Sequence, residues 1–466
     1  MSVRSILAVL CLAAAFSTPP GLFAQERPPN FVVIFADDLG YGDLAAYGHP
    51  TINTPNLDRM AAEGQRWTDF YVAASVCTPS RAGLITGRLP IRSGMMSYKS
   101  RVLFPDSTGG LPPSEITIAE VLKQKSYATA AVGKWHLGHL PQYLPTSQGF
   151  DSYFGIPYSN DMSRISPAPP RDQLWGEKSK SEYFNVPLMR NEEEIERPAH
   201  QPTLTKRYTD EAVKFIRAHR EQPFFLYLPH SMVHVPLFRS PEFEGHSRRG
   251  LFGDALEEID WSVGRILDTL EELGLERNTL VVFTSDNGPW LTFDEQGGSA
   301  GPLRMGKGST WEGGMREPGL FWMPGTVKPG VVHGMGATLD LLPTFAAMAG
   351  VKAPDDRELD GYDLTPVLRG TGPSPRNEIF YYRGTDVWAA RVGRYKAHFK
   401  TKSGYLKDPQ LDHEPPLLFD LEADPGEKYD VAAEHPEAVA AIRRRVAEHR
   451  ATVKPVKDQL ADRTGR

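Results

Sequence analysis

Two apolar runs far apart in the chain each end in side-chain oxygens. Residues 31–35 precede Asp37 and Asp38, and residues 280–285 precede Asp286 and Asn287. Uninterrupted runs rich in β-branched and aromatic residues predict strands that are buried on both faces, as in a parallel sheet. Open α/β sheets bind ligands outside the carboxyl ends of their strands. The chain is therefore predicted to be an α/β protein with an oxygen-rich site at one edge of its sheet.

Helical periodicity alternates with further apolar runs, which indicates βαβ units. Helices are predicted at residues 56–63, 116–125, 205–220, 254–274 and 338–350, and a short strand at 224–228. At 466 residues the chain is long for one core, so a large and a smaller domain are expected. Residues 160–203 have weak periodicity and are interpreted as long surface excursions near the site.

A Pro/Gly-rich stretch at residues 370–375 marks the expected domain boundary. Beyond it, short strands are predicted at residues 378–383, 387–392, 395–399 and 417–421, followed by a helix at 435–452. The expected organisation is a catalytic domain over residues 25–370 and a smaller α+β domain over residues 371–466.

Residues 1–24 have the pattern of a signal peptide, with Arg4, an apolar run and a small-residue cleavage site after Ala24. No segment is long and apolar enough to predict a stable membrane span. The chain has no Asn-x-Ser/Thr sequon and one cysteine after the leader, which favours a periplasmic or secreted bacterial protein over a lysosomal one. The net charge of −6, without a long block of one sign, indicates no nucleic-acid partner.

That single cysteine, Cys77, begins the run Cys-Thr-Pro-Ser-Arg. An unpaired cysteine is often a small buried hydrophobe, and this interpretation is the plain alternative. However, Pro79 suits the first turn of a helix, and Arg81 lies one helical turn from Cys77 on the same face. Free N–H groups, the positive end of the helix dipole and a guanidinium together predict an anion site beside a reactive group.

Residues 77–87 resemble the signature of the type I sulfatases, Cys-x-Pro-Ser-Arg followed by Thr-Gly. In that family the cysteine is oxidised to formylglycine, whose hydrated aldehyde carries two hydroxyls on one carbon. One hydroxyl attacks sulfur, and deprotonation of the other expels sulfate. The resemblance therefore implies covalent catalysis by Cys77 after modification, and a formylglycine-generating or sulfatase-maturing enzyme as a partner.

The four residues that follow the apolar runs, Asp37, Asp38, Asp286 and Asn287, are hard oxygen ligands. Such ligands favour Ca²⁺, with Mg²⁺ as the less favoured ion. Each pair alone could also be a turn sequence. The resemblance implies a divalent metal at these positions that also contacts sulfate and the formylglycine oxygen of residue 77.

A second segment, residues 131–138, resembles another sulfatase signature, although Ser126 stands where the family usually has glycine. If the segment is a strand end, Lys134 and His136 project from one face and Trp135 points into the core. The resemblance implies that Lys134 binds sulfate and that His136 orients or deprotonates the second hydroxyl. A solvated lysine and a core histidine are the alternatives.

Three further positions match residues of the family. His234 matches the histidine beside the leaving-group oxygen, whereas His230 has no match and is interpreted as structural. Lys307, between two glycines, and Ser159 match groups that bind the sulfate. Together with Arg81, the two lysines would stabilise a tetrahedral anion by electrostatic preorganisation.

The resemblance covers nearly all of the chain after the leader, and is closest to the branch of arylsulfatase A and N-acetylgalactosamine-6-sulfatase. It implies an alkaline-phosphatase-like fold: a large mixed, mostly parallel sheet between helices, plus a small C-terminal antiparallel sheet with a terminal helix. The expected activity is hydrolysis of sulfate monoesters, on a sulfated carbohydrate. A phosphate ester hydrolase of the same superfamily and a non-catalytic sulfated-glycan binding protein are the alternatives. Specificity is expected from residues 93–110 and 161–202.

Overall fold

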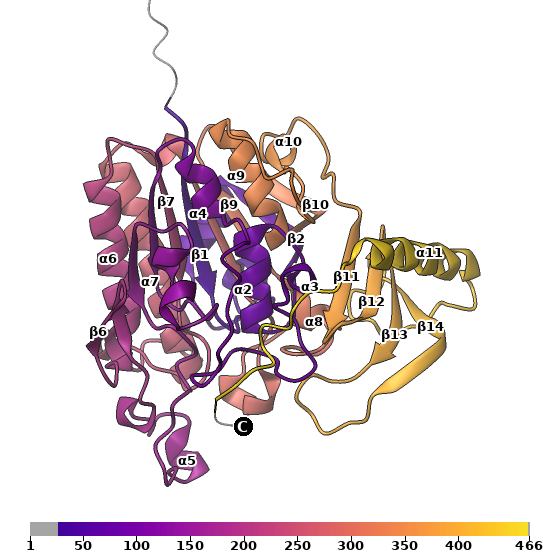
Figure 1. Ribbon diagram of the computed structural model, residues 1–466, viewed down its shortest axis with the longest axis horizontal. Coiled ribbons are helices and arrows are strands. Elements are labelled where there is room, and N and C mark those ends of the chain that lie inside the picture. The colour runs from indigo at the N-terminus through magenta and orange to yellow at the C-terminus, as the bar shows by residue number, and fades with distance from the viewer. Residues whose placement is uncertain (1–26, 465–466) are drawn as a thin grey trace, which may run out of the picture.

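A mixed ten-stranded sheet forms the centre of the large domain in the computed structural model, which describes residues 27–464 (Figure 1). The expected leader lies outside the described residues. The strands run in the order β10-β2-β9-β8-β1-β7-β3-β4-β5-β6, and the central five, from β8 to β4, are parallel. Their bounds are β1 Asn30–Ala36, β2 Gln65–Tyr71, β3 Ala128–Val132, β4 Ser152–Gly155, β5 Leu188–Arg190, β6 Glu193–Glu196, β7 Phe224–Pro229, β8 Thr279–Ser285, β9 Arg316–Trp322 and β10 Gly330–Ala337.

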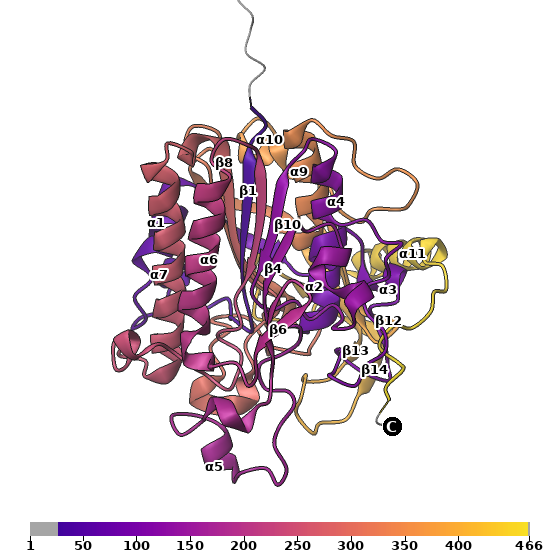
Figure 2. The same cartoon turned by 60° about the vertical axis from the view of Figure 1, so that its left-hand side comes forward.

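Helices cover both faces of this sheet (Figure 2). One face is covered by α1 (Pro55–Glu63), α6 (Leu204–Ala218) and α7 (Leu251–Glu272), and the other by α2 (Cys77–Thr86), α4 (Ile118–Lys123) and α9 (Leu341–Ala349). Shorter helices are α3 (Pro90–Ser93), α5 (Arg171–Leu174), α8 (Glu312–Met315) and α10 (Thr365–Leu368). The helix predicted at residues 338–350 is a 3-10 turn, Thr338–Asp340, that continues into α9.

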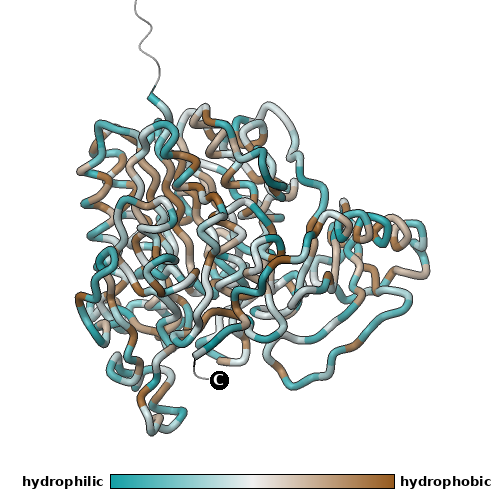
Figure 3. Tube along the Cα trace, in the orientation of Figure 1, coloured by the Kyte–Doolittle hydropathy of each residue, from teal (hydrophilic) through white to brown (hydrophobic). Residues whose placement is uncertain are grey.

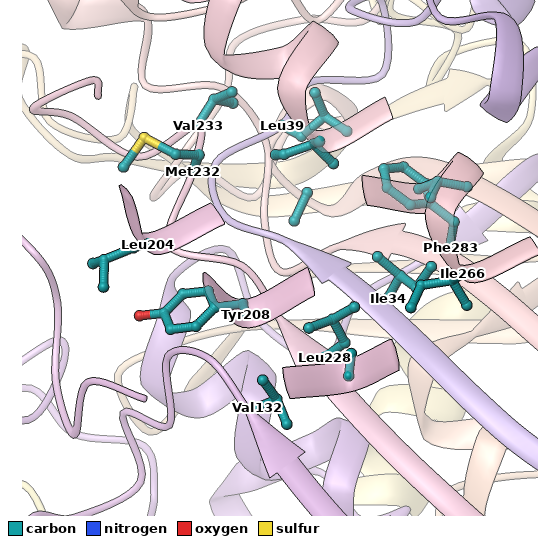
Figure 4. Close-up of a cluster of buried hydrophobic side chains, with 14 of the residues drawn as sticks. Ile34, Leu39, Val132, Leu204, Tyr208, Leu228, Met232, Val233, Ile266 and Phe283 are labelled. Atoms are coloured by element: carbon teal, nitrogen blue, oxygen red, sulfur yellow. The ribbon is translucent and has the colours of Figure 1, made fainter. Parts of the chain in front are cut away.

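The alternation of side chains along β1 explains why its sequence is apolar throughout. Val32 and Ile34 belong to the core under α6 and α7, whereas Phe31, Val33 and Phe35 belong to the core under α4 and α9. Figure 4 shows the first of these cores, where Ile34 lies beside Phe283 of β8 and Ile266 of α7. In Figure 3 the hydrophobic stretches accordingly run through the interior of the large domain. The predicted α/β fold with a mostly parallel central sheet is confirmed.

The smaller C-terminal sheet lies at one side of the large domain (Figure 1). It is antiparallel, in the order β11-β12-β13-β14, and α11 (Pro436–Thr452) packs on β12 and β13. The strands are β11 Glu378–Arg383, β12 Asp386–Val392, β13 Tyr395–Thr401 and β14 Leu411–Asp420. After α11 the chain returns to the large domain, where the Gln459 amide donates to the Gly94 carbonyl and Leu460 is buried.

The region interpreted as surface excursions contains secondary structure that the sequence did not predict. Besides α5, it forms β5 and β6, which extend the sheet at one edge. The residues of β6 are Glu-Glu-Ile-Glu, of which the first three are exposed. Charged residues on an edge strand prevent pairing with another chain, and they also hide the apolar alternation by which strands are predicted.

A buried polar network joins the C-terminal sheet to β2 and α8. Glu312 of α8 accepts hydrogen bonds from the hydroxyls of Tyr71 (2.6 Å) and Tyr381 (2.7 Å) and from Nζ of Lys396 (2.9 Å). Lys396 also pairs with Glu427 at 3.0 Å, and the side chains of Lys396 and both glutamates are fully buried. Burial by itself would raise the pKa of Glu312, but Lys396 and neighbouring arginines lower it, so the carboxylate is ionised.

Among residues 27–464, no helix is long and apolar enough to cross a bilayer.

Candidate active site

The carboxyl ends of the five parallel strands meet at one edge of the sheet. The register pairs Ala36 of β1 with Ser285 of β8, and Phe35 of β1 with Pro229 of β7. Residues that follow these strands are therefore neighbours, as predicted from the two apolar runs. The predicted site residues supplied by strand ends are Asp37 and Asp38 after β1, Asp286 and Asn287 after β8, Lys134 and His136 after β3, His234 after β7 and Ser159 after β4.

Cys77 is the first residue of α2, which confirms the predicted helix start. It is only 2% exposed, and Val76 before it is extended. Burial raises the pKa of the Cys77 thiol to about 11, although Lys134 and Lys307 act in the opposite direction. An unmodified Cys77 is thus a neutral thiol at physiological pH and a poor nucleophile.

Arg81 is fully buried and held by three hydrogen bonds. Its Nε and Nη2 donate to Oδ2 of Asp286 at 3.0 and 2.8 Å, and its Nη1 donates to the Lys134 carbonyl at 2.7 Å. Oδ2 of Asp37 lies 3.5 Å from Nη2. The guanidinium is therefore fixed in place next to the first turn of α2.

Two lysines complete the cationic side of the centre. Lys134 Nζ donates to Oδ2 of Asp37 and to Oγ of Ser159 (3.2 Å). Lys307 Nζ lies 2.7 and 2.8 Å from the two carboxylate oxygens of Asp38. The centre thus balances three carboxylates against three cations, namely Asp37, Asp38 and Asp286 against Arg81, Lys134 and Lys307.

Hydrogen bonds determine the tautomers of the two histidines. Nε2 of His136 lies 2.9 Å from the Leu103 carbonyl, and Nδ1 of His234 lies 2.6 Å from the Val235 carbonyl. Because a carbonyl only accepts, these nitrogens carry the protons. Nδ1 of His136, which is buried without a partner, is then the free base. Burial and nearby lysines lower the pKa of both rings, so both are neutral.

The centre gathers several carboxylate and amide oxygens together with the sulfur of Cys77 and a nitrogen of His234. Ligand atoms of Asp37, Asp38, Cys77 and His234 all lie within 4.8 Å of one another. Oδ1 of Asp37 and Oδ1 of Asn287 are buried without partners, which is costly unless a positive charge satisfies them.

The other hydrogen bonds of these side chains leave oxygen lone pairs free for that cation. Burial raises the pKa of Asp38 to about 7 despite Lys307, and Asp37 and Asp286 contribute to the rise, so an added cation would stabilise the ionised form of Asp38. Asp286 accepts from Arg81 through Oδ2 and from the Asp38 amide through Oδ1 (3.1 Å). A carboxylate has about four acceptor positions, so Oδ1 keeps a free lone pair. The residues present fit a calcium ion.

Some features of the site were not evident from the sequence. Asp38 and His136 have left-handed backbones, with φ of 61° and 59°, which non-glycine residues adopt at a cost of about 1 kcal/mol or more. Trp290 was not singled out, yet its ring lies 4.3 Å from Lys307 Nζ and 5.4 Å from the His234 ring. The one feature of the sequence that could have indicated a place for Trp290 in the site is its position shortly after Asn287. Trp135 is buried in the core, as predicted, and His230 lies beside Ser262.

Comparisons with known proteins agree with this architecture. The sulfatase family model matches residues 29–351, and a model of the C-terminal region of aryl-sulfatase matches residues 374–465. Arylsulfatase A of Homo sapiens is 46% identical over 469 residues, which cover 94% of this chain and 89% of that protein. N-acetylgalactosamine-6-sulfatase of Homo sapiens is 41% identical, with coverages of 94% and 89%.

A solved structure shows the same fold over nearly the whole chain. The PsFucS1 sulfatase from Pseudoalteromonas sp. superposes with a TM-score of 0.82 at 31% identity and covers 92% of this chain and 91% of its own. The chain therefore belongs to the sulfatase family and is a sulfuric ester hydrolase of the arylsulfatase type.

Proposed function

We propose that the protein hydrolyses sulfate monoesters of carbohydrates through a formylglycine made from Cys77, with the sulfate held by calcium, Arg81, Lys134 and Lys307. The observation that carries this proposal is the convergence of a helix N-terminus bearing Cys77 with three cations and three carboxylates in one buried centre. A pairwise balanced centre can accept a divalent cation and a sulfate dianion together without a net change of charge.

The proposed metal ligands are Asp37, Asp38, Asp286, Asn287 and the modified residue 77. When bound, calcium would supply positive charge that polarises the sulfate. Formylglycine would supply two hydroxyls on one carbon, one to attack sulfur and one to expel the sulfate afterwards.

The chain's own residues would bind the anion and move the protons. Arg81, Lys134 and Lys307 would bind sulfate oxygens and stabilise the charge that develops during transfer, and Ser159 would donate a hydrogen bond. His136 would take a proton on Nδ1, its free nitrogen. His234 would orient, or protonate through Nε2, the leaving oxygen. A bound dianion favours the imidazolium that this step needs.

The first test is mass spectrometry of the tryptic peptide 67–81 from protein produced together with a formylglycine-generating enzyme. We expect residue 77 to be an aldehyde, with oxygen in place of sulfur and two hydrogens fewer than serine would have, and we expect the modified fraction to equal the fraction that is active on an aryl sulfate. A matched aryl phosphate serves as the control substrate. A residue that remains a thiol in fully active protein, or a preference for the phosphate, would contradict the proposal.

Removal of calcium is expected to abolish activity and to lower stability. Chelation leaves the buried oxygens of Asp37 and Asn287 without a partner, and saturation at a hundred times Kd stabilises a protein by about 2.7 kcal/mol. The measurement is the thermal midpoint and kcat/KM after chelation and after addition of Ca²⁺ or Mg²⁺. Ca²⁺ should restore both at the lower concentration, and an unchanged midpoint in all conditions would refute a resident cation.

Unmodified Cys77 is expected to resist alkylation in the folded protein. Its 2% exposure and its raised pKa should slow reaction with iodoacetamide at pH 8 by more than about a hundredfold relative to the unfolded chain. Mass spectrometry of samples quenched over time, with and without urea, measures both rates. Equal rates would show that the first turn of α2 opens readily.

A further inference from the structure

A cavity of about 290 Å³ lies between the loop before α2 and the C-terminal sheet. Its walls include Ser75 and Val76, which directly precede Cys77, and three basic side chains, Arg101, Arg383 and Lys402. This volume is near the lower end of small-molecule sites, about 300 Å³, and suits one sugar unit with its substituents.

The three cations of this cavity lack a close carboxylate partner among the described residues, although Asp408 acts on Arg383 and Lys402 from a longer distance. Within residues 27–464, Arg101, Arg383 and Lys402 form no ion pair, and Nη1 of Arg383 is buried without any acceptor. Nη2 of Arg383 reaches only the Gly404 carbonyl, at 3.3 Å. Burial and Arg101 lower the pKa of Arg383 to about 10, which Tyr405 and Asp408 only partly oppose. The cavity therefore has positive charge that an anion would neutralise.

A neighbouring cavity shows that unpaired arginines are not general in this protein. That cavity, of about 270 Å³, lies under α11 and is also lined by three arginines. Each of these has a carboxylate partner, at 2.8 Å for Arg92 with Asp360, 2.5 Å for Arg376 with Asp340 and 2.7 Å for Arg445 with Glu378. The charges there are satisfied by the protein itself.

Aromatic rings lie against two of the three cations, and an exposed tyrosine lines the cavity. Arg383 lies over the Trp388 ring at 4.8 Å, and Arg101 lies over the Tyr405 ring at 4.5 Å. Tyr98, which lines the cavity, is 58% exposed, whereas Tyr405, 38% exposed, lines a neighbouring pocket beside Lys307. Such exposed rings offer apolar faces to a sugar, while the fixed guanidinium forks suit sulfate or carboxylate oxygens.

The cavity shares a wall with the catalytic centre. Nη2 of Arg101 donates to the Gly308 carbonyl, and the Gly308 amide donates to the Ser75 carbonyl, both at 2.7 Å. Gly308 follows Lys307 and has φ of +80°, and a Cβ there would lie 2.6 Å from Arg101. The positive φ favours glycine at this position, and the missing side chain leaves room for Arg101 beside the segment that carries Lys307.

We propose that this cavity is a second anion subsite, which binds a further sulfate or carboxylate of the carbohydrate whose sulfate ester is cleaved at residue 77. The substrate class is then a saccharide with at least two anionic groups. This inference rests on the proposed function, because it places the cleaved ester in the centre next to the cavity.

The test compares three disaccharides: one with a single sulfate ester, one with a second sulfate, and one with a uronate carboxylate in its place. For the modified wild-type enzyme, kcat/KM should rise by about tenfold or more when the second anion is present, since a charge-assisted hydrogen bond contributes about 1.5–3 kcal/mol. A rise with both groups supports a general anion subsite, and a rise with one identifies the group. No rise with either would overturn the inference.

Variants that remove one positive charge test whether the preference for a second anion arises in this cavity. In Arg383→Gln and Lys402→Gln, the ratio of kcat/KM for the doubly anionic over the singly anionic substrate should fall by about tenfold. Lys407→Gln removes the same charge from an exposed position in the same loop that does not line the cavity, so its ratio should equal that of the wild type. If this ratio is unchanged in both cavity variants, the preference for a second anion does not arise from this cavity.

A binding measurement distinguishes failure of the subsite proposal from failure of the proposed catalytic function. Calorimetric titration of Cys77→Ala protein with the same disaccharides requires no turnover. The second anion should tighten Kd, and Arg383→Gln in the same background should remove that gain. If aryl sulfate hydrolysis by the modified enzyme is absent while this pattern persists, the catalytic proposal fails and the subsite stands. Equal Kd values would overturn the subsite alone.

Discussion

Cys77→Ser is expected to release one equivalent of alcohol product per active site and then to stop. Serine has a single hydroxyl, so it can attack sulfur but then holds a sulfate ester with no second hydroxyl on the same carbon to expel it. Steady-state kcat should fall by about 10⁴-fold or more, the scale seen when a catalytic nucleophile is lost. Stopped-flow release of an aryl leaving group measures the burst, and mass spectrometry should find sulfate on peptide 67–81.

Cys77→Ala is the matched control for this experiment, because it removes the nucleophile and should give neither burst nor sulfated peptide. Both variants replace a buried small side chain with one of similar or smaller size, so their thermal midpoints should stay close to that of the unmodified protein. Steady turnover by Cys77→Ser at the rate of the modified enzyme would refute a role for two hydroxyls on residue 77.

Lys396→Met is expected to lower the free energy of unfolding by about 3–5 kcal/mol, the scale of breaking a buried ion pair by removing one partner. The lysine is fully buried between Glu312 and Glu427, at 2.9 and 3.0 Å, and its loss leaves two buried carboxylates short of positive charge. Because this network joins the C-terminal sheet to β2 and α8, urea unfolding should show earlier exposure of that sheet, and hydrogen exchange in β11–β14 should locate the change.

Lys400→Met provides the comparison on the same strand. Lys400 pairs with Asp386 at 2.8 Å, but the two side chains are 30% and 41% exposed, so the change should cost about 0–1 kcal/mol. Equal losses in the two variants would show that the buried network contributes no more than a surface pair.

The secondary structure could be predicted where the local pattern agreed with the final packing. The buried strands β1, β7 and β8 have continuous apolar runs, and α6 and α7 have helical periodicity, because each packs against a core. β6 was missed because this exposed edge strand carries charged residues in place of an apolar alternation, and β5 was missed because it is only 3 residues long. The return of residues 459–464 to the large domain depends on single contacts such as Gln459 with Gly94, which have no periodic pattern.

The residues proposed for the active site could be named from short motifs and their resemblance to a family, and all but Lys307 lie after a strand or in the first turns of α2. Their arrangement required the fold. The pairing of Lys307 with Asp38, the free Nδ1 of His136 and the ring of Trp290 depend on side chains that approach across strand ends. The second anion subsite is the clearest case, since Arg101, Arg383 and Lys402 are hundreds of residues apart or on different strands and loops. Burial, charge balance and tautomers are properties of three-dimensional neighbours, and no periodicity along the chain encodes them.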